Sequence, residues 1–207
     1  MIIMMADKKH SGQRLGIDVE GTIVDIFTPL LNTAREKYKS TDTKESIAND
    51  GINYAFSNIP HQIVRDICTK LWHENTDLKL IDDAIPSIIS SFRENGDSVI
   101  ICTATYANPK EVKKWLDNHD IKYDAFIYVD KQESKVQLRL DAIIDDNAAV
   151  INSFSNAGNR GIFLKGWWNH GELPTITNSD LSVVVSSWME AKESVDKFRS
   201  LLRKKED

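Results

Sequence analysis

A short apolar run that ends on two acids is the stretch of this chain that most limits how it can fold. Leu15-Gly16-Ile17 leads directly into Asp18 and Glu20, and a Gly21-Thr22 turn follows. Ionised carboxylates in an apolar setting cost several kcal/mol unless a partner holds them. A divalent cation or a phosphate-binding loop would explain the placement, whereas a surface strand end would leave both acids solvated. The stretch therefore predicts a strand that leads into a functional site, provided that the rest of the chain supplies partners for the acids.

Apolar runs of three or four residues recur further along the chain. Continuous runs of this kind are typical of strands that are covered on both faces, as in a parallel sheet. The runs that predict strands are Val99–Cys102, Phe126–Val129, Ala142–Ile144, Ile162–Leu164 and Val183–Val185. Helical patterns separate them, and strands that alternate with helices form parallel sheets through right-handed crossovers. We therefore predict an α/β fold, with a Rossmann-like parallel sheet of about five to six strands flanked by helices.

The helices are predicted from apolar residues that recur at spacings of three and four. Such patterns cover Phe27–Tyr38 and Ile63–Leu71. Another begins at Asp82 or Asp83, which are good N-cap residues, and Gly96 is placed to end it. Two further helix starts are predicted from capping residues, at Asn108-Pro109 and at Ser187–Glu190.

The segment between the first strand and residue 83 shows helical patterns but no clear strand. Its polar stretch from Ser40 to Pro60 includes a predicted turn at Asp50-Gly51. We expect this segment to form a small helical cap that is inserted after the first strand and lies over the strand ends. The expected organisation is a flexible N-terminus at 1–13, an α/β core at 14–25 and 84–207, and a helical cap at 26–83.

Composition and charge exclude several classes of function. The 207 residues are 41% hydrophobic, which suffices for a packed core and exceeds what a disordered chain contains. The formal net charge is -5 and there is no basic stripe, so we expect no nucleic-acid duplex as a partner. No apolar run approaches the roughly 18 residues of a membrane helix, so no membrane partner is expected. The two cysteines, Cys68 and Cys102, fit a reducing compartment, and we expect a cytoplasmic protein.

Three of the predicted strands end in residues that can carry chemistry. Asp18 and Glu20 follow the first strand, Thr103 follows the second, and Asp145-Asp146 follow the run at Ala142–Ile144. The carboxyl ends of parallel strands are where α/β sheets place their sites, so these residues should be neighbours. Crowded carboxylates need a neutralising cation, and oxygen ligands with waters favour Mg2+. Such a set can attack phosphorus with a carboxylate, hold phosphate with a hydroxyl and a lysine, and use a second acid for proton transfer.

These motifs resemble those of the haloacid dehalogenase superfamily of phosphohydrolases. Asp18-Val19-Glu20-Gly21-Thr22 matches the first signature of that family, Asp-x-Asp-Gly-Thr/Val, with one change. Thr103 after an apolar strand matches the second, a lysine ahead of the acid pair matches the third, and Asp145-Asp146 matches the fourth. The resemblance extends from about Leu15 to about Asn169, which is most of the chain. It therefore implies the same fold and the same class of reaction for this protein.

Within that superfamily the chain is most similar to the 5′(3′)-deoxyribonucleotidase branch, because Lys135 lies ten residues before Asp145. By this resemblance, Asp18 is the nucleophile that becomes an aspartyl phosphate, and Glu20 is the catalytic acid and base. The family usually has an aspartate where Glu20 stands, although enolase-phosphatases of the same superfamily carry a glutamate there. Thr105 stands where the nucleotidase branch often has arginine or serine, which bears on nucleotide specificity and not on phosphate chemistry.

The resemblance also implies a ligand set. Mg2+ would be bound by Asp18, by Asp146 and by the backbone carbonyl of Glu20. Asp145 belongs to the same metal set, in a supporting place, and the order of the two neighbouring aspartates stays open. The residues implied to hold the phosphate of a small phosphorylated metabolite are Thr103, Ala104 and Lys135.

Several alternatives stay open from the sequence. Lys131 competes with Lys135 for the phosphate, and the spacing favours Lys135. Aromatic residues such as Tyr54 and Trp72 can stack on a base, although aromatics at helical spacing are more often core. Trp167-Trp168 has no assigned role. Besides a nucleoside monophosphate, the substrate can be a sugar phosphate or an enolase-phosphatase-like diketone, and the chain can also be a non-catalytic module that binds phosphorylated ligands.

Overall fold

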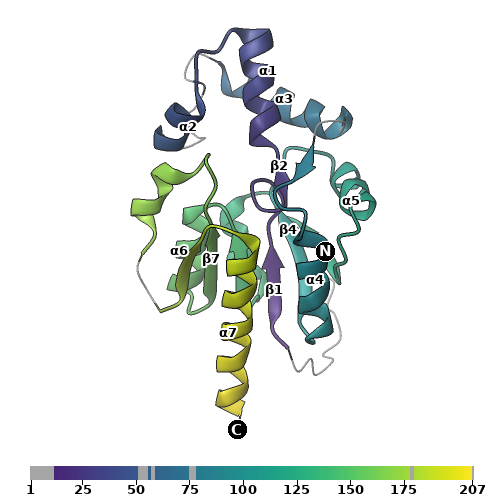
Figure 1. The fold of residues 1–207 in the computed structure, drawn as a ribbon, viewed down its shortest axis with the longest axis vertical. Coiled ribbons are helices and arrows are strands. Elements are labelled where there is room, and N and C mark those ends of the chain that lie inside the picture. Colours follow the sequence, from purple (N-terminus) through teal and green to yellow (C-terminus); the bar gives the residue numbers. More distant parts are fainter. Residues whose placement is uncertain (1–11, 51–55, 57–58, 75–77, 178–179, 207) are drawn as a thin grey trace.

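The centre of the fold is a parallel sheet of six strands in the order β5-β4-β1-β6-β7-β8. Figure 1 labels β1, β4 and β7 of this sheet. The computed structural model describes residues 12–50, 56, 59–74, 78–177 and 180–206. The expected flexible stretch before residue 12, Gly51 of the predicted turn and Tyr54 lie outside the described residues. The strands of the sheet are β1 (Arg14–Ile17), β4 (Ser98–Thr103), β5 (Ala125–Tyr128), β6 (Ala142–Asp145), β7 (Arg160–Leu164) and β8 (Ser182–Val185). The predicted α/β fold with a parallel sheet is confirmed.

Strand β1 lies in the middle of the sheet. Leu15 pairs with Val99 of β4 on one side and with Ala142 of β6 on the other, and all of these pairings are parallel. Leu15 and Ile17 are fully buried, which explains why the first apolar run carries no polar residue. The carboxyl end of β1 therefore places Asp18 between the ends of the two neighbouring strands.

Helices cover both faces of the sheet. On one face, α4 (Ile85–Glu94) and α7 (Trp188–Glu206) share a core cluster with the inward side chains of β1 and with α5 (Pro109–Asn118). On the other face, α6 (Ala148–Asn156) packs its apolar side chains against β6 and β7. Both faces of the central strands are thus covered, and the carboxyl ends of these strands remain for a site. Among the described helices, none combines the length and the apolarity that crossing a membrane requires.

A helical insertion lies beyond the carboxyl ends of the strands (Figure 1). It consists of α1 (Phe27–Tyr38), α2 (Lys44–Asp50) and α3 (His61–Glu74). Its apolar side chains form a cluster of their own, to which Leu30, Leu31 and Ile67 belong. Trp168, from the loop after β7, packs into the same cluster and so connects the insertion with the sheet.

The expectation of no strand between Asp25 and Asp83 is wrong. Two short strands, β2 (Val24–Asp25) and β3 (Lys79–Leu80), pair in antiparallel fashion where the chain enters and leaves the helical insertion. Two residues per strand are too few to produce a recognisable alternation of apolar and polar residues. The pair brings the two ends of the insertion together next to the end of β1.

Two other expectations need correction. The helix expected to begin at Asp82 or Asp83 starts later, after Ala84, which makes no side-chain capping bond. Oδ1 of Asp82 accepts a hydrogen bond of 2.9 Å from the N–H of Ala84, so this aspartate closes a turn ahead of the helix. The run Phe126–Val129 was expected to be covered on both faces, but β5 is an edge strand and Tyr128 is 44% exposed.

Candidate active site

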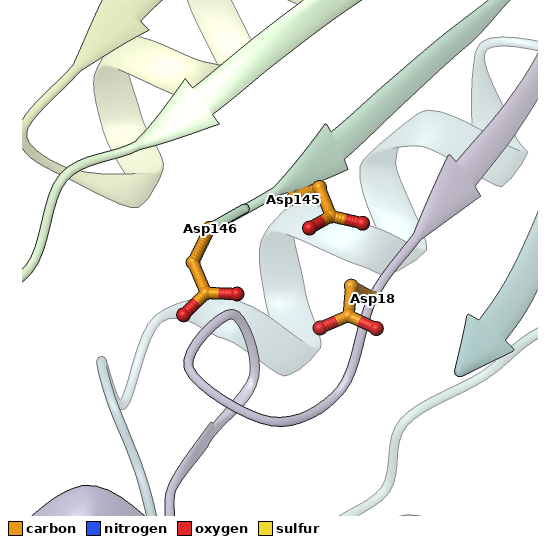
Figure 2. A group of neighbouring side chains, drawn as sticks. All are labelled: Asp18, Asp145 and Asp146. Atoms are coloured by element: carbon orange, nitrogen blue, oxygen red, sulfur yellow. The ribbon is translucent and has the colours of Figure 1, made fainter. Parts of the chain in front are cut away.

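Three aspartates converge where β1 and β6 end (Figure 2). Asp18 directly follows β1, and its N–H donates to the carbonyl of Ile144 at 3.0 Å, which extends the pairing with β6 by one residue. Asp145 is the last residue of β6, and Asp146 follows it. One carboxylate oxygen from each aspartate lies within 4.8 Å of the others. The structure thus brings together the three acids that the sequence places at strand ends.

The loop after Asp18 depends on a glycine. The backbone carbonyl of Val19 accepts hydrogen bonds of 2.8 and 2.9 Å from N–H groups later in the loop, which makes the turn tight. Gly21 has a φ of 75°, in the left-handed region that side chains disfavour. A Cβ at this position would also overlap the Asp146 carboxylate and crowd the Phe27 ring. Gly21 therefore lets the first motif approach the last one closely.

Lys135 links two of the three aspartates. It lies on a 3-10 helix, η1 (Gln132–Leu138), and its side chain is fully buried. Nζ donates to Oδ1 of Asp18 at 2.6 Å and to Oδ2 of Asp145 at 2.8 Å. Lys131, the competing lysine, is exposed. Of the two lysines, Lys135 is therefore the one that the structure brings to the cluster.

Burial and charge set the protonation of this cluster. Burial raises the pKa of Asp18 to about 8, and the ammonium group of Lys135 opposes that rise. Burial also raises the pKa of Asp146 well above its usual value, and repulsion from Asp18 and Asp145 adds to the effect. Burial disfavours the charge on Lys135, but the carboxylates of Asp145 and Asp18 outweigh it and raise the pKa of the lysine. Three carboxyl groups thus share one ammonium group, an imbalance that a bound cation would relieve.

Glu20 extends toward the ends of β4 and α3. Its Oε2 accepts a hydrogen bond of 2.7 Å from the hydroxyl of Thr103, the last residue of β4. Its Oε1 accepts a hydrogen bond of 3.1 Å from the indole N–H of Trp72 on α3. Thr103 is fully buried, and Ala104, which follows it, lies at the same edge of the sheet. Thr105 instead accepts a hydrogen bond of 3.0 Å from the N–H of Ala107, inside its own turn.

Trp168 and Asn169 contact the site, and sequence reasoning assigned neither of them. The indole N–H of Trp168 donates to Oδ2 of Asp146 at 2.7 Å, and its ring packs on Phe27 with 5.1 Å between ring centroids. The side-chain amide of Asn169 donates to the backbone carbonyls of Asp146, at 2.9 Å, and Leu164, at 3.0 Å. Both residues follow a predicted strand on the same edge of the sheet as the acids. Their position after that strand is the sequence feature from which a role at the site could have been predicted.

The donor set fits a hard divalent cation. All three side chains offer carboxylate oxygen, which Mg2+ prefers. Both oxygens of Asp145 already accept hydrogen bonds, one from Lys135 and one from the N–H of Asn147 at 2.9 Å. Within the described part of the chain, hydrogen bonds engage only Oδ1 of Asp18 and only Oδ2 of Asp146. Asp18 and Asp146 are therefore better placed than Asp145 to give an oxygen to a metal.

One family model matches the chain along most of its length. Its description is "5' nucleotidase, deoxy (Pyrimidine), cytosolic type C protein", and it matches residues 13–198. No curated protein sequence matches the chain.

Solved structures share the fold at low sequence identity. A predicted phosphatase from Clostridium acetobutylicum has a TM-score of 0.64 and 14% identity, and the match covers 90% of this chain and 99% of that one. A haloacid dehalogenase-like hydrolase from Streptococcus pneumoniae has a TM-score of 0.62 and 13% identity, with 87% and 97% covered. A phosphonoacetaldehyde hydrolase-like protein from Oleispira antarctica has a TM-score of 0.60 and 10% identity, with 96% and 97% covered.

Proposed function

Because the chain belongs to the family of cytosolic type C 5′ nucleotidases, within the haloacid dehalogenase superfamily, we propose that it is a phosphatase that hydrolyses a small phosphomonoester. We propose that Mg2+ is its cofactor and that a nucleoside monophosphate is the first substrate to test. The observation that carries the proposal is the buried Lys135, which bridges Asp18 and Asp145 at the strand ends. Apolar residues of similar volume often stabilise a fold as well as a buried ion pair does, so a buried lysine between two acids suits a site that receives a charged phosphate group.

In the first step, a carboxylate oxygen of Asp18 attacks phosphorus, and the bond from phosphorus to the ester oxygen breaks. Lys135 favours the ionised form of Asp18 that this attack needs. Glu20 gives a proton to the leaving oxygen, so an alcohol departs and an aspartyl phosphate remains. The indole N–H of Trp72 can only donate, so it keeps Oε1 of Glu20 as an acceptor. The transferred proton is therefore carried on Oε2, next to the Thr103 hydroxyl, which can both donate and accept.

In the second step, the carboxylate of Glu20 takes a proton from a water molecule, and the water oxygen attacks phosphorus. The bond between phosphorus and Asp18 breaks, which releases inorganic phosphate and restores the Asp18 carboxylate. Glu20 thus returns to the protonated form in which it began. One acid–base group serves both half-reactions, and atoms and protons balance over the cycle.

We propose that Thr103, Ala104 and Lys135 hold the phosphate group. The ammonium group of Lys135 has three N–H donors, of which two point to carboxylates here, so one remains for a phosphate oxygen. The Thr103 hydroxyl and the backbone of Ala104 lie at the end of the neighbouring strand. With phosphate bound, the Thr103 hydroxyl would turn its single hydrogen from Glu20 to a phosphate oxygen, so that it and Ala104 bind the phosphate group from the side of β4.

We propose that Asp18, Asp146 and the backbone carbonyl of Glu20 hold Mg2+, and that Asp145 supports the site by fixing Lys135. When bound, Mg2+ supplies charge neutralisation to the phosphate oxygens. We also propose that residues 26–83 act as a cap over a core made of 14–25 and 84–207. The cap would then supply the contacts that choose the alcohol part of the substrate.

The test is phosphate release, with and without Mg2+, from a panel of nucleoside monophosphates and sugar phosphates. Asp18→Asn is the test variant. Asp141→Asn is the matched control, because Asp141 is an exposed acid whose carboxylate, among the residues that the structure describes, accepts a hydrogen bond only from the N–H of Arg14, at 2.7 Å. We expect Mg2+-dependent turnover by the wild type and the control, and none by Asp18→Asn.

Equal, metal-independent turnover by all three proteins would refute the proposal of an Mg2+-dependent phosphatase with Asp18 as its nucleophile. Turnover of sugar phosphates alone would keep the reaction and replace the substrate. Binding of phosphate without turnover by any of the three would instead favour a non-catalytic phospho-ligand-binding module.

A further inference from the structure

Helix α3 of the helical insertion reaches into the main core with Trp72, and Leu71 packs against the same core cluster. Trp72 is 1% exposed and belongs to the core cluster of β1, α4 and α7, whereas Ile67 on the same helix belongs to the cluster of the insertion. The Trp72 ring meets the ring of Trp115 edge to face, with 6.0 Å between ring centroids. Trp115 lies on α5, which packs on the sheet. Trp72 therefore connects the insertion physically to the part of the molecule that carries the site.

The same indole group also holds Glu20. Trp72 donates to one carboxyl oxygen at 3.1 Å, while Thr103 donates to the other at 2.7 Å. One oxygen is thus held from the helical insertion and the other from the sheet. An aspartate at this position would place its carboxyl group about 1.5 Å further back, one carbon–carbon bond, which would break at least one of these contacts. The length of Glu20 is therefore matched to a donor on α3.

We propose that Trp72 is a positioning residue for Glu20. Its indole N–H fixes the carboxyl group that exchanges protons with the leaving oxygen, so that Glu20 is in place only while α3 is packed against α5. This inference rests on the proposed phosphatase function, and it names a residue outside the four motifs. A loss of position of about 1 Å at an acid–base group can cost about a hundredfold in rate. The effect of losing the indole N–H is expected to fall on the step that needs a proton.

The test replaces Trp72 with phenylalanine, which keeps an aromatic ring against Trp115 and removes the N–H. The matched control is Trp115→Phe. The Nε1–H of Trp115 is buried and has no acceptor among the residues that the structure describes, so its removal breaks no hydrogen bond of the site. Both variants change the same aromatic pair, and only one of them removes a donor to Glu20.

The readout is kcat/KM, with Mg2+ present, for two substrates. One is p-nitrophenyl phosphate, whose leaving group needs little protonation, and the other is the fastest phosphomonoester of the panel, whose alkyl leaving oxygen departs as an alcohol only when it receives a proton. Because kcat/KM covers the steps up to departure of the leaving group, its ratio for the two substrates reports proton transfer to the leaving oxygen. A partly unfolded variant lowers both values equally, so the ratio is independent of the folded fraction.

For Trp72→Phe we expect kcat/KM to fall about 10- to 100-fold for the alkyl phosphomonoester and less than about threefold for p-nitrophenyl phosphate. For Trp115→Phe we expect an unchanged ratio. Equal losses on both substrates in Trp72→Phe, with a wild type that hydrolyses both, would refute the role of Trp72 and leave the phosphatase proposal standing. A wild type that hydrolyses neither substrate would overturn the proposed function, and this inference would fall with it.

Discussion

Replacement of Lys135 by methionine removes the ammonium group from the centre of the site. The lysine is fully buried, and it donates to Asp18 at 2.6 Å and to Asp145 at 2.8 Å. Methionine has a similar unbranched shape, so the change is mainly one of charge. A hydrogen bond to a charged group contributes about 1.5–3 kcal/mol. Loss of one partner of a buried pair costs about 3–5 kcal/mol, and we expect the unfolding free energy of the metal-free variant to fall by that amount.

The expected fall in the unfolding free energy of Lys135→Met depends on pH. Folding raises the pKa of Asp18 from 3.8 to about 8, mainly through burial. A group whose pKa is raised by folding stabilises the folded state at low pH, and this contribution is lost as pH rises through the raised value. Lys135 opposes this rise, so its removal raises the pKa of Asp18 further. At about pH 6 the protonated Asp18 needs no counter-charge, whereas at about pH 9 the variant has to keep a proton on Asp18 or leave its carboxylate without a counter-charge, and either costs stability. The full fall is therefore expected on the alkaline side.

The measurement is urea unfolding, followed by circular dichroism in the presence of EDTA, at both pH values. Lys131→Met is the matched control, because this lysine is exposed, and we expect its effect to stay within about 0.5 kcal/mol. Added Mg2+ should stabilise Lys135→Met more than the wild type, since the variant site has one positive charge fewer. Equal free energies of unfolding for Lys135→Met and the wild type at about pH 9 would refute the proposed effect of the contacts that Lys135 makes with Asp18 and Asp145.

Three further predictions concern the surroundings of the site. Gly21→Ala should lower the melting temperature and weaken Mg2+ binding in calorimetry, because its Cβ would overlap the Asp146 carboxylate; unchanged values for both would contradict the loop geometry. Trp168→Phe should weaken Mg2+ binding about 10- to 100-fold in the same titration, since its N–H holds Asp146, and an unchanged affinity would speak against that role. Burial raises the pKa of both Cys68 and Cys102 to about 12. Iodoacetamide should therefore modify neither thiol in the native protein at mildly alkaline pH and both thiols in urea, as measured by mass spectrometry. Rapid modification of the native protein would be inconsistent with this burial.

Much of the sheet and the acid cluster could be predicted from the sequence, because both leave local signals. A buried central strand such as β1 is a continuous apolar run, and Asp18 at its end is conspicuous for the same reason. Asp145 was recognisable in the same way at the end of β6. Parallel topology then makes these strand ends neighbours without any knowledge of distances.

The contacts that hold the acids could not be predicted in this way. Trp72 reaches Glu20, and Trp168 reaches Asp146, across separations of 52 and 22 residues. The sequence pattern of a tryptophan at helical spacing is the same whether its indole N–H lacks an acceptor or donates to a carboxylate. The strand pair at the base of the insertion was missed because two residues per strand leave no pattern. Such features depend on tertiary packing, which the sequence pattern does not record.

In the proposed mechanism, Asp18 forms a covalent bond to phosphorus. The most direct test is to mix the protein with Mg2+ and the fastest substrate of the panel, stop the reaction with acid within milliseconds, and locate the phosphate by peptide mass spectrometry. We expect an acid-stable, hydroxylamine-sensitive phosphate on the peptide that contains Asp18, and none in Asp18→Asn. Turnover by the wild type with no phosphate on that peptide, or with phosphate on another residue, would show that Asp18 is not the nucleophile.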